Sequence, residues 1–206
     1  MGRIAVIDFE TTGMSPDFGD RPTEVAIVLV EDGRIVDRYQ SLMNAGVRVS
    51  PFITQLTGIT NAMVASAPPA AEVMREASRF VNGQPMAAHN ASFDRKFWVD
   101  EMRRLHLPAD HAFACTMLLA RRLYPQAPNH KLGTLVDFHG LPRTGAAHRA
   151  LADAEMAAEL LIRMHHDLQH VHGMDEVAHD QLVELQSCQR GAVAGWLSRR
   201  SRAQAR

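Results

Sequence analysis

The chain has 206 residues and 46% hydrophobic content, which is enough for one packed core and excludes a largely disordered protein. With only two cysteines, a disulfide framework is excluded. No apolar run reaches the roughly 18 residues of a membrane helix, and the start lacks a signal-peptide pattern. We therefore expect a cytoplasmic protein without a membrane partner. The 22 basic and 23 acidic residues give a net charge of −1, which taken alone disfavours a nucleic-acid-binding protein.

The first part of the chain reads as three strands. Residues 3–8 and 23–31 are apolar and rich in β-branched side chains, which is typical of buried strands. Asp32 and Gly33 provide a turn with positive φ angles, after which residues 35–42 can return as an antiparallel partner. The sequence therefore predicts a meander of three strands at the start of the fold.

Strand and helix patterns alternate after the meander. Residues 44–69 are interrupted by Gly and Pro, so we expect a loop with short helical turns there. Residues 85–89 fit a short strand. Apolar spacing predicts helices over residues 70–81, 92–105, 116–123, 132–138, 149–170 and 174–187. This order predicts an α/β fold with a mixed sheet, in which the antiparallel meander is followed by parallel strands and helices flank the sheet.

The C-terminal part carries an uneven charge. Residues 187–206 hold five arginines and no acid, so the remainder of the chain is acidic on balance. We interpret this segment as a solvated, partly frayed terminus, and contact with phosphates or a partner is the alternative. We expect a domain over residues 1–170 and a helical extension with an Arg-rich tail over residues 171–206.

Three acidic clusters carry the chemistry, and the first ends the first strand. Residues 8–13 read Asp-Phe-Glu-Thr-Thr-Gly. Because residues i and i+2 of a strand share a face, Asp8 and Glu10 project to the same side. Two hard oxygen ligands suit Mg2+ or Mn2+, and the backbone of Gly13 can approach a ligand closely. Alone, this short pattern is common and is more typical of a strand that ends at the surface.

The second cluster lies between the short strand and the helix that follows it. Residues 89–94 read His-Asn-Ala-Ser-Phe-Asp, which places Asp94 in the first turn of that helix. Side chains converge at strand ends in α/β sheets, so this is a position for a functional carboxylate. The alternative is that Asp94 only complements the helix dipole.

The third cluster opens the longest predicted helix. Residues 148–153 read His-Arg-Ala-Leu-Ala-Asp. Five residues of a helix correspond to roughly 140° of rotation, so His148 and Asp153 cannot share a helix face. We therefore expect His148 on the loop before the helix and Asp153 in its first turn, from where both can approach one centre. A capping His and an exposed Asp are the alternative.

Together the clusters resemble the DEDDh exonucleases, a family of 3′–5′ exonucleases that includes the proofreading epsilon-type subunits of bacterial DNA polymerase III. The family patterns Asp-x-Glu-Thr-Thr-Gly, His-Asn-x-x-Phe-Asp and His-x-Ala-x-x-Asp match residues 8–13, 89–94 and 148–153 in the expected order. The family's Leu-Thr-Gly-Ile segment matches residues 56–59. The resemblance covers about residues 1–170 and implies an RNase H-like fold and two bound divalent ions, Mg2+ or Mn2+.

The resemblance also implies the roles of the acidic residues. Asp8, Glu10 and Asp153 would bind the metals, and Asp94 would do so directly or through water. His148 would be the general base, because an imidazole titrates near working pH. His89 is a weaker candidate for that role, because the family places the base in the third cluster.

Other positions match the family's pocket for the terminal nucleotide. They are Thr11, Thr12, Gly13, Met14, Asn90 and Phe93, and Leu56 is expected to be a wedge against the last base. Unstacking is easiest in single strands and contacts to base faces tolerate any sequence, so we expect single-stranded or frayed 3′ ends as substrate.

The function expected from the sequence is a metal-dependent 3′–5′ exonuclease that removes nucleoside 5′-monophosphates from DNA, with a DNA polymerase as a partner to consider. The same chemistry on RNA, as in the oligoribonuclease and RNase T branches, remains open at this point. A non-catalytic nucleic-acid-binding scaffold with this fold is the alternative of another class, and its expected signature is a lost carboxylate, which this sequence does not show.

Overall fold

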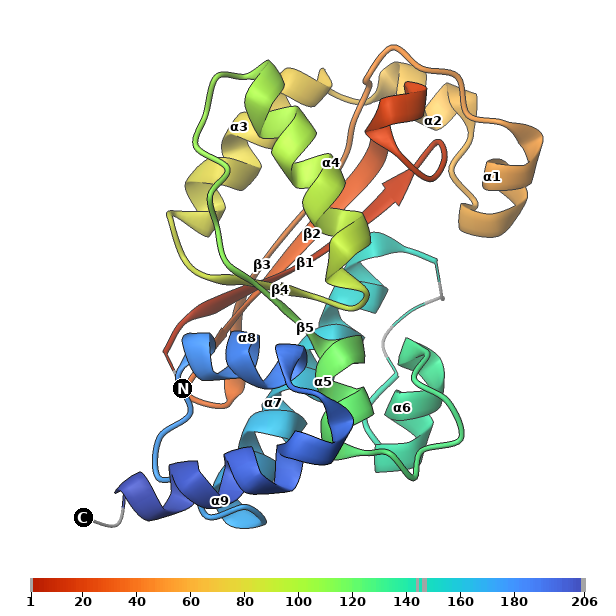
Figure 1. Cartoon of the computed structure of the whole chain (residues 1–206). Coiled ribbons are helices and arrows are strands. Elements are labelled where there is room, and N and C mark those ends of the chain that lie inside the picture. The colour runs from red at the N-terminus through yellow and green to blue at the C-terminus, as the bar shows by residue number, and fades with distance from the viewer. Residues whose placement is uncertain (1, 144, 146–147, 205–206) are drawn as a thin grey trace.

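A computed structural model describes residues 2–143, 145 and 148–204. Within these residues the chain forms one five-stranded sheet in the order β3-β2-β1-β4-β5 (Figure 1). The strands are β1 Ile4–Thr11, β2 Pro22–Glu31, β3 Arg34–Leu42, β4 Met86–Ala88 and β5 Phe113–Cys115. β1, β2 and β3 pair antiparallel, whereas β4 pairs parallel with both β1 and β5. The predicted α/β fold with a mixed sheet is confirmed.

The predicted turn between the second and third strands is also confirmed. Asp32 and Gly33 have φ angles of 49° and 74°, the left-handed region that a two-residue hairpin of this kind requires. Glu31 pairs with Arg34 directly beside the turn. The turn therefore sets the pairing of β3 with β2 beside it, and Glu24, near the other end of β2, pairs with Glu10 of β1.

Helices cover both faces of the sheet. The helices that precede β4 are α1 Pro51–Thr57, α2 Asn61–Ser66 and α3 Ala70–Val81, with a short 3-10 helix, η1, at Pro16–Phe18. Those that follow are α4 Ala91–Arg104, α5 Thr116–Leu123, α6 Leu132–His139, α7 Ala150–His170, α8 His179–Ser187, a short 3-10 helix, η2, at Arg190–Ala192, and α9 Val193–Gln204. α3 and α4 share one apolar core with the sheet, and α5, α7, α8 and α9 share the other (Figure 1).

The central strand β1 decides where the first acidic pair lies. Its side chains alternate between the two cores, with Ile4 and Val6 facing the core of α7 and Ile7 and Phe9 facing the core of α4. By this period of two, the next residues on the α7 side are Asp8 and Glu10. The end of β1 therefore presents two carboxylates toward the start of α7.

Two elements differ from the sequence prediction. The strand β5 was not predicted, and its parallel pairing with β4 (Met86 with Phe113) is what reveals it. The helix predicted over residues 174–187 begins only at His179. Met174 and Val177 precede it outside any helix and are buried in the core of α7, so their apolar spacing reflects tertiary packing rather than helix.

The C-terminal segment, interpreted as a solvated and partly frayed terminus, is not frayed in residues 193–201, although several of its side chains are exposed. α9 reaches Gln204, and its Trp196 and Leu197 are only 8% and 9% exposed. The indole Nε1 of Trp196 donates to Glu184 of α8 at 3.4 Å, and Arg200 forms an ion pair with the same carboxylate. Arg206 and the side chain of Arg202 lie outside the described residues.

α8 and α9 contribute to the same core as α7, through Leu182, Leu185 and Trp196. A boundary at residue 170 is therefore not visible as a break in the packing, and the division into 1–170 and 171–206 stays a prediction. Among the described residues, none of the helices combines the length and the apolar character that crossing a membrane requires.

Candidate active site

The end of β1 places two acidic side chains against the neighbouring strand and α7. Asp8 is half-buried, and Glu10 is 9% exposed. Glu10 lies directly opposite Glu24 in the antiparallel pairing of β1 and β2. Three carboxylates therefore gather on one face of two adjacent strands, where water reaches them poorly.

Asp94 reaches the C-terminal end of β1 from α4, which covers the other face of the sheet. Asn90 adopts a left-handed conformation (φ 65°) at the N-cap of α4, which lets the helix start directly after β4. Asp94 follows in the first turn and is 2% exposed. Its Oδ1 accepts a hydrogen bond from the backbone N–H of Phe9 at 3.1 Å, which ties α4 to β1 between Asp8 and Glu10.

His148 and Asp153 lie where the helix geometry predicted. α7 begins at Ala150, so His148 precedes it, and Asp153 is in its first turn. His148 has a φ of 60°, and its backbone N–H donates to Oδ2 of Asp153 at 3.1 Å. One potential ligand atom each from Glu10, His148 and Asp153 lie within 4.8 Å of one another. The first and third clusters therefore meet.

The four predicted metal ligands destabilise one another as anions. Burial raises the pKa of Asp8 well above its usual range, and the charges of Asp94, Asp153 and Glu10 raise it further. Burial and the neighbouring Asp153 and Glu24 raise the pKa of Glu10 to about 7. Burial also raises the pKa of Asp94, to about 8, and that of Asp153.

This donor set fits divalent cations. The described residues show no ion pair between any of the four carboxylates and a Lys or Arg side chain, and buried carboxylates of like charge otherwise have to be protonated. Oxygen ligands of this kind are what Mg2+ and Mn2+ prefer. The cluster is therefore a candidate acidic metal centre.

His89 does not belong to this centre. Its Nδ1 lies 2.9 Å from Thr116 Oγ1, and its Nε2 lies 3.1 Å from the backbone oxygen of His130. Burial lowers the pKa of His89 to about 4, so the ring is neutral and both nitrogens are engaged. Its geometry is that of a link between the α4 entry and α5, whereas His148 is exposed beside the carboxylates.

Glu24 is a residue of the site that sequence reasoning missed. It is fully buried, and Arg149 donates to both of its carboxylate oxygens, at 2.8 and 3.2 Å. It also accepts from the side chain of Gln40 at 2.7 Å and from the backbone N–H of Ala150 at 3.2 Å. Glu24 thereby fixes the start of α7, between His148 and Asp153, to the sheet. A charged residue at the head of an otherwise apolar strand was the only signal in the sequence.

The pocket residues after β1 belong to a tightly bonded loop. Thr11 Oγ1 donates to the carbonyl of Gly13 at 2.6 Å, and Thr12 Oγ1 accepts from the backbone N–H of Arg21 at 3.0 Å. A Cβ at Gly13 would lie 2.3 Å from Asp20 Oδ1, so any other residue here would displace the Asp20 carboxylate. The close approach that the sequence indicated at Gly13 is therefore an approach of Asp20.

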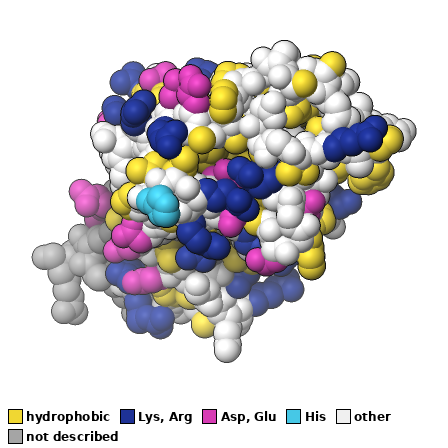
Figure 2. All heavy atoms as spheres, turned by 90° about the horizontal axis from the view of Figure 1, so that it is seen from above, with side chains coloured by type: hydrophobic (Ala, Val, Ile, Leu, Met, Phe, Trp, Pro, Cys, Tyr) yellow, Lys and Arg dark blue, Asp and Glu magenta, His cyan; other side chains and the backbone are white. Residues whose placement is uncertain are grey.

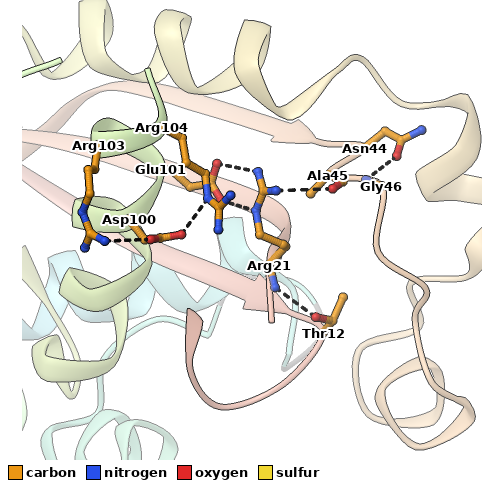
Figure 3. A network of polar contacts seen from close by, with 9 residues as sticks. All are labelled: Thr12, Arg21, Asn44, Ala45, Gly46, Asp100, Glu101, Arg103 and Arg104. Carbon is orange, nitrogen blue, oxygen red and sulfur yellow. Dashed lines mark hydrogen bonds and ion pairs between the residues drawn. The ribbon is translucent and has the colours of Figure 1, made fainter. Parts of the chain in front are cut away.

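Arg21 joins this loop to two other segments, as Figure 3 shows. Its guanidinium forms a two-pronged ion pair with Glu101 of α4, at 2.6 and 2.9 Å, and donates to the backbone oxygen of Ala45 at 3.4 Å. Glu101 is only 2% exposed. The loop after β1, helix α4 and the segment that leads to α1 are thus held together by one buried pair.

The remaining pocket residues lie on three separate elements. Met14 on the β1–β2 loop is 70% exposed and Leu56 on α1 is 44% exposed. Asn90 is the N-cap of α4, and the half-buried ring of Phe93 packs against Phe97 with ring centroids 5.1 Å apart. How these residues surround a nucleotide stays a prediction.

Sequence comparisons identify related proteins. A model of the exonuclease family matches residues 5–161. The chain is 36% identical over 170 residues (82% of its length) to a DNA polymerase III PolC-type of Caldanaerobacter subterraneus subsp. tengcongensis. It is 35% identical over 164 residues (79%) to the 3′-5′ exonuclease DinG of Bacillus subtilis. These matches span only 12% and 17% of the two relatives.

Solved structures with the same fold are nucleases as well. Exonuclease X in complex with 5′ overhanging duplex DNA matches with a TM-score of 0.71 and 29% identity, over 89% of this chain and 99% of that one. The nuclease domain of 3′hExo, a DEDDh family member bound to rAMP, matches with a TM-score of 0.68 over 80% of this chain and 92% of that one. At 23% identity, the second match shows the fold alone.

Proposed function

Since the chain belongs to the exonuclease family, in which the DEDDh exonucleases share its three acidic clusters, we propose that it is a divalent-metal-dependent 3′–5′ exonuclease acting on DNA. The PolC-type and DinG relatives are much longer proteins, of which this chain matches 12% and 17%, so the activity of this chain rests on its own site. The scaffold alternative predicts a lost carboxylate, and all four are present.

One observation carries the proposal. Four carboxylates from β1, α4 and α7 converge at the C-terminal end of β1. They are buried or half-buried, and none has a basic partner among the described residues. Other buried acids of the chain are paired, as Glu24 is with Arg149 and Glu101 with Arg21. The cluster is costly for the metal-free fold, and such a cost is typical of a site that binds cations.

Asp8, Glu10, Asp94 and Asp153 would hold two divalent ions, Mg2+ or Mn2+. Bound there, the ions would supply charge neutralisation, an acidified water and stabilisation of the leaving 3′-oxygen. His148 would take the proton of the attacking water, because it is exposed, lies beside Glu10 and Asp153, and is positioned by its own backbone bond to Asp153. The product would be a nucleoside 5′-monophosphate.

The side chains around the carboxylates would hold the terminal nucleotide. Thr11, Thr12 and Gly13 are fixed by the loop bonds described above, and Asn90 and Phe93 open α4 next to Asp94. Met14 and Leu56 expose apolar side chains that can lie against a base. We assign these residues to substrate binding and orientation rather than to chemistry.

A role beside a DNA polymerase would fit the PolC-type relatives. The segment available for such a contact is roughly residues 171–206, in which Arg199 of α9 is exposed. We also propose a cytoplasmic location, because both cysteines, Cys115 and Cys188, are free thiols.

The test is a titration of Mg2+ and Mn2+ on matched, end-labelled DNA and RNA oligomers, with Asp8→Ala as the control. Stepwise shortening of DNA from the 3′ end, absent in the variant, is the expected result. Shortening of RNA alone would move the enzyme to the RNA-degrading branch. No shortening of either would favour a binding scaffold.

A further inference from the structure

Histidine is concentrated around the end of α7. Of the 11 histidines in the chain, five lie between positions 165 and 179, namely His165, His166, His170, His172 and His179. On the upper face of the molecule, by contrast, histidine (cyan in Figure 2) is sparse among the acidic and basic side chains. None of the five takes part in the catalytic chemistry proposed above.

Two of the five histidines are structural. His165 is 4% exposed, and its Nε2 lies 3.2 Å from the backbone oxygen of Val177, in the segment before α8. Nε2 of the half-buried His179 lies 2.8 Å from a backbone oxygen of β4. Burial lowers the pKa of both rings, so they are neutral and held by the backbone. His166 and His170 differ from them, because both are exposed on the last two turns of α7.

His166 and His170 form a stacked pair. They are four positions apart, so their side chains lie one above the other on the same face of the helix. The centroids of the two imidazole rings are 4.1 Å apart, and the ring planes are only 15° from parallel. The side chain of His166 is 59% exposed, so a dissolved ion can reach the pair.

The Nδ1 atom of His166 faces an anion. It lies 3.4 Å from Oδ1 of Asp167, which is 6% exposed. Burial alone would raise the pKa of Asp167, but hydrogen bonds from Arg163 and Tyr124 lower it, so this carboxyl is ionised. An ionised carboxylate only accepts hydrogen bonds. Nδ1 of His166 therefore carries the proton, and Nε2 keeps its lone pair.

The Nδ1 atom of His170 faces a carbonyl. It lies 3.0 Å from the backbone oxygen of His166, one turn earlier. A carbonyl also only accepts, so Nδ1 of His170 carries the proton and Nε2 keeps its lone pair. Nε2 is the ring nitrogen farther from the backbone, so each ring offers its lone pair at its outer end. Histidines that bind metals have this arrangement, in which the second ring nitrogen donates to a carboxylate or a carbonyl and fixes the ligand tautomer.

Two such nitrogens suit a different metal from the acidic cluster. Imidazole nitrogen suits Zn2+, whereas Mg2+ and Mn2+ prefer oxygen, and two histidines at positions i and i+4 of one helix face are a zinc-binding arrangement. Tetrahedral Zn2+ with bonds of about 2.0–2.1 Å separates two nitrogens by roughly 3.3 Å. Exposed rings whose centroids are 4.1 Å apart reach that separation by a small turn of the side chains.

We propose that His166 and His170 form a second metal site, which binds Zn2+ through the two Nε2 atoms. Within the described part of the chain, the acidic centre is the only group of three or more potential ligand residues within 4.8 Å of one another, so water completes the coordination at this pair. Asp153 lies roughly 20 Å earlier along the same helix, so the two sites share no ligand and the proposal does not depend on the nuclease assignment. A metal that bridges positions i and i+4 closes one helical turn, so bound Zn2+ stabilises the C-terminal end of α7.

The test is a calorimetric titration of Zn2+ into the chain without an affinity tag, in excess Mg2+. The variant is His170→Gln, which removes one exposed ring and keeps the contact between His166 and Asp167. The matched control is His106→Asn, because His106 is exposed after α4 and its φ of 55° is one that Asn tolerates. Asp8→Asn separates the two sites, because it alters the acidic cluster alone.

We expect one Zn2+ site that His170→Gln weakens at least about 10-fold, the scale on which even a group that orients a ligand acts. His106→Asn and Asp8→Asn should retain that site. With Zn2+ at about ten times its Kd, amide hydrogen exchange in the last turn of α7 should slow about 10-fold, and His170→Gln should abolish this protection. Equal Zn2+ affinity in the wild type and His170→Gln would overturn the proposal. A loss of the same size in His106→Asn, or loss of the site in Asp8→Asn, would overturn it as well.

Discussion

Glu10 and Glu24 face each other across β1 and β2, yet their surroundings are opposite. Glu24 is buried but receives four hydrogen bonds, and the bonds from Arg149, Gln40 and Ala150 outweigh the effect of burial and lower its pKa. The Glu10 carboxylate accepts no comparable bond within the described part of the chain, and burial together with Asp153 and Glu24 raises its pKa to about 7. Two neighbouring acids of the same kind therefore differ in what the fold provides for their charge.

The difference distinguishes a structural acid from candidate metal ligands at the C-terminal end of β1. The charge of Glu24 is balanced by Arg149 and by its hydrogen bonds, so Glu24 stabilises the start of α7. Among the described residues, Asp8, Glu10, Asp94 and Asp153 form no ion pair with a Lys or Arg side chain, which leaves them for the charge of a bound cation. Substitutions of Glu24 and of the four unpaired carboxylates are therefore expected to change activity, metal binding and stability to different degrees or in opposite directions.

The largest effect on activity is expected at the four carboxylates without a basic partner among the described residues. Asp8→Asn should lower the rate at least about 10⁴-fold, the scale on which members of a catalytic unit act. The same variant should melt at a higher temperature in EDTA, because one buried repulsive charge is gone. Initial rates with Mg2+ and thermal unfolding in EDTA measure the two effects, and Asp37→Asn on the exposed face of β3 is the control. Normal activity of Asp8→Asn would refute the metal centre.

A smaller loss is expected at the proposed base. His148→Ala should reduce kcat about 10²- to 10⁴-fold, the usual contribution of a general base, while Mn2+ binding survives. His89→Asn should lower kcat less, because both ring nitrogens of His89 are already engaged away from the site. Single-turnover rates and calorimetric Mn2+ titration provide the readout. An equal loss in both variants would contradict the assignment of His148.

Glu24, the acid that is paired with Arg149, should have an intermediate effect on metal binding. Glu24→Gln removes the charge that holds Arg149 and the Ala150 N–H, so we expect Mn2+ affinity to fall about 10- to 100-fold, as it does when groups that orient ligands are changed. Glu31→Gln, on the same strand but in an exposed pair with Arg3, is the control. Unchanged Mn2+ affinity in Glu24→Gln would show that Glu24 acts on stability alone.

The smallest effect concerns stability and pH in the metal-free protein. A carboxyl whose pKa rises from 4.5 to about 7 on folding, as at Glu10, binds more protons in the folded state, so stability falls as pH rises through that window. We expect a loss on the order of 1–3 kcal/mol between pH 5 and 8 in EDTA, since one pKa unit corresponds to about 1.4 kcal/mol. Urea unfolding measures it.

Mn2+ should abolish this pH dependence, and Asp8→Asn should reduce it. Glu24 has the opposite sign, because its pKa is lowered on folding and its contribution is lost as pH falls. That loss lies below the unfolded pKa of 4.5, so Glu24 does not affect the comparison of pH 5 with pH 8. Metal-free protein that is more stable at pH 8 than at pH 5 would contradict the prediction for Glu10.

The sequence by itself determined the fold class and the position of each acidic cluster on its own element. Asp8 with Glu10, Asp94, and His148 with Asp153 each belong to a short local pattern, and the strand period and helix geometry place each pattern correctly relative to its own element. The Asp32–Gly33 turn and the Ala70–Val81 helix are local in the same sense, because turn chemistry and apolar spacing are properties of neighbouring residues.

Only the tertiary structure decided which charges are paired. Glu24 meets Arg149 across 125 positions and Arg21 meets Glu101 across 80, and no local pattern links such residues. The same holds for β5, which exists through its pairing with β4, and for α9, whose Trp196 is covered by α8. Burial removes water from a carboxylate, and the fold alone determines whether another side chain replaces it, so the distinction between a structural acid and a metal ligand appears only in three dimensions.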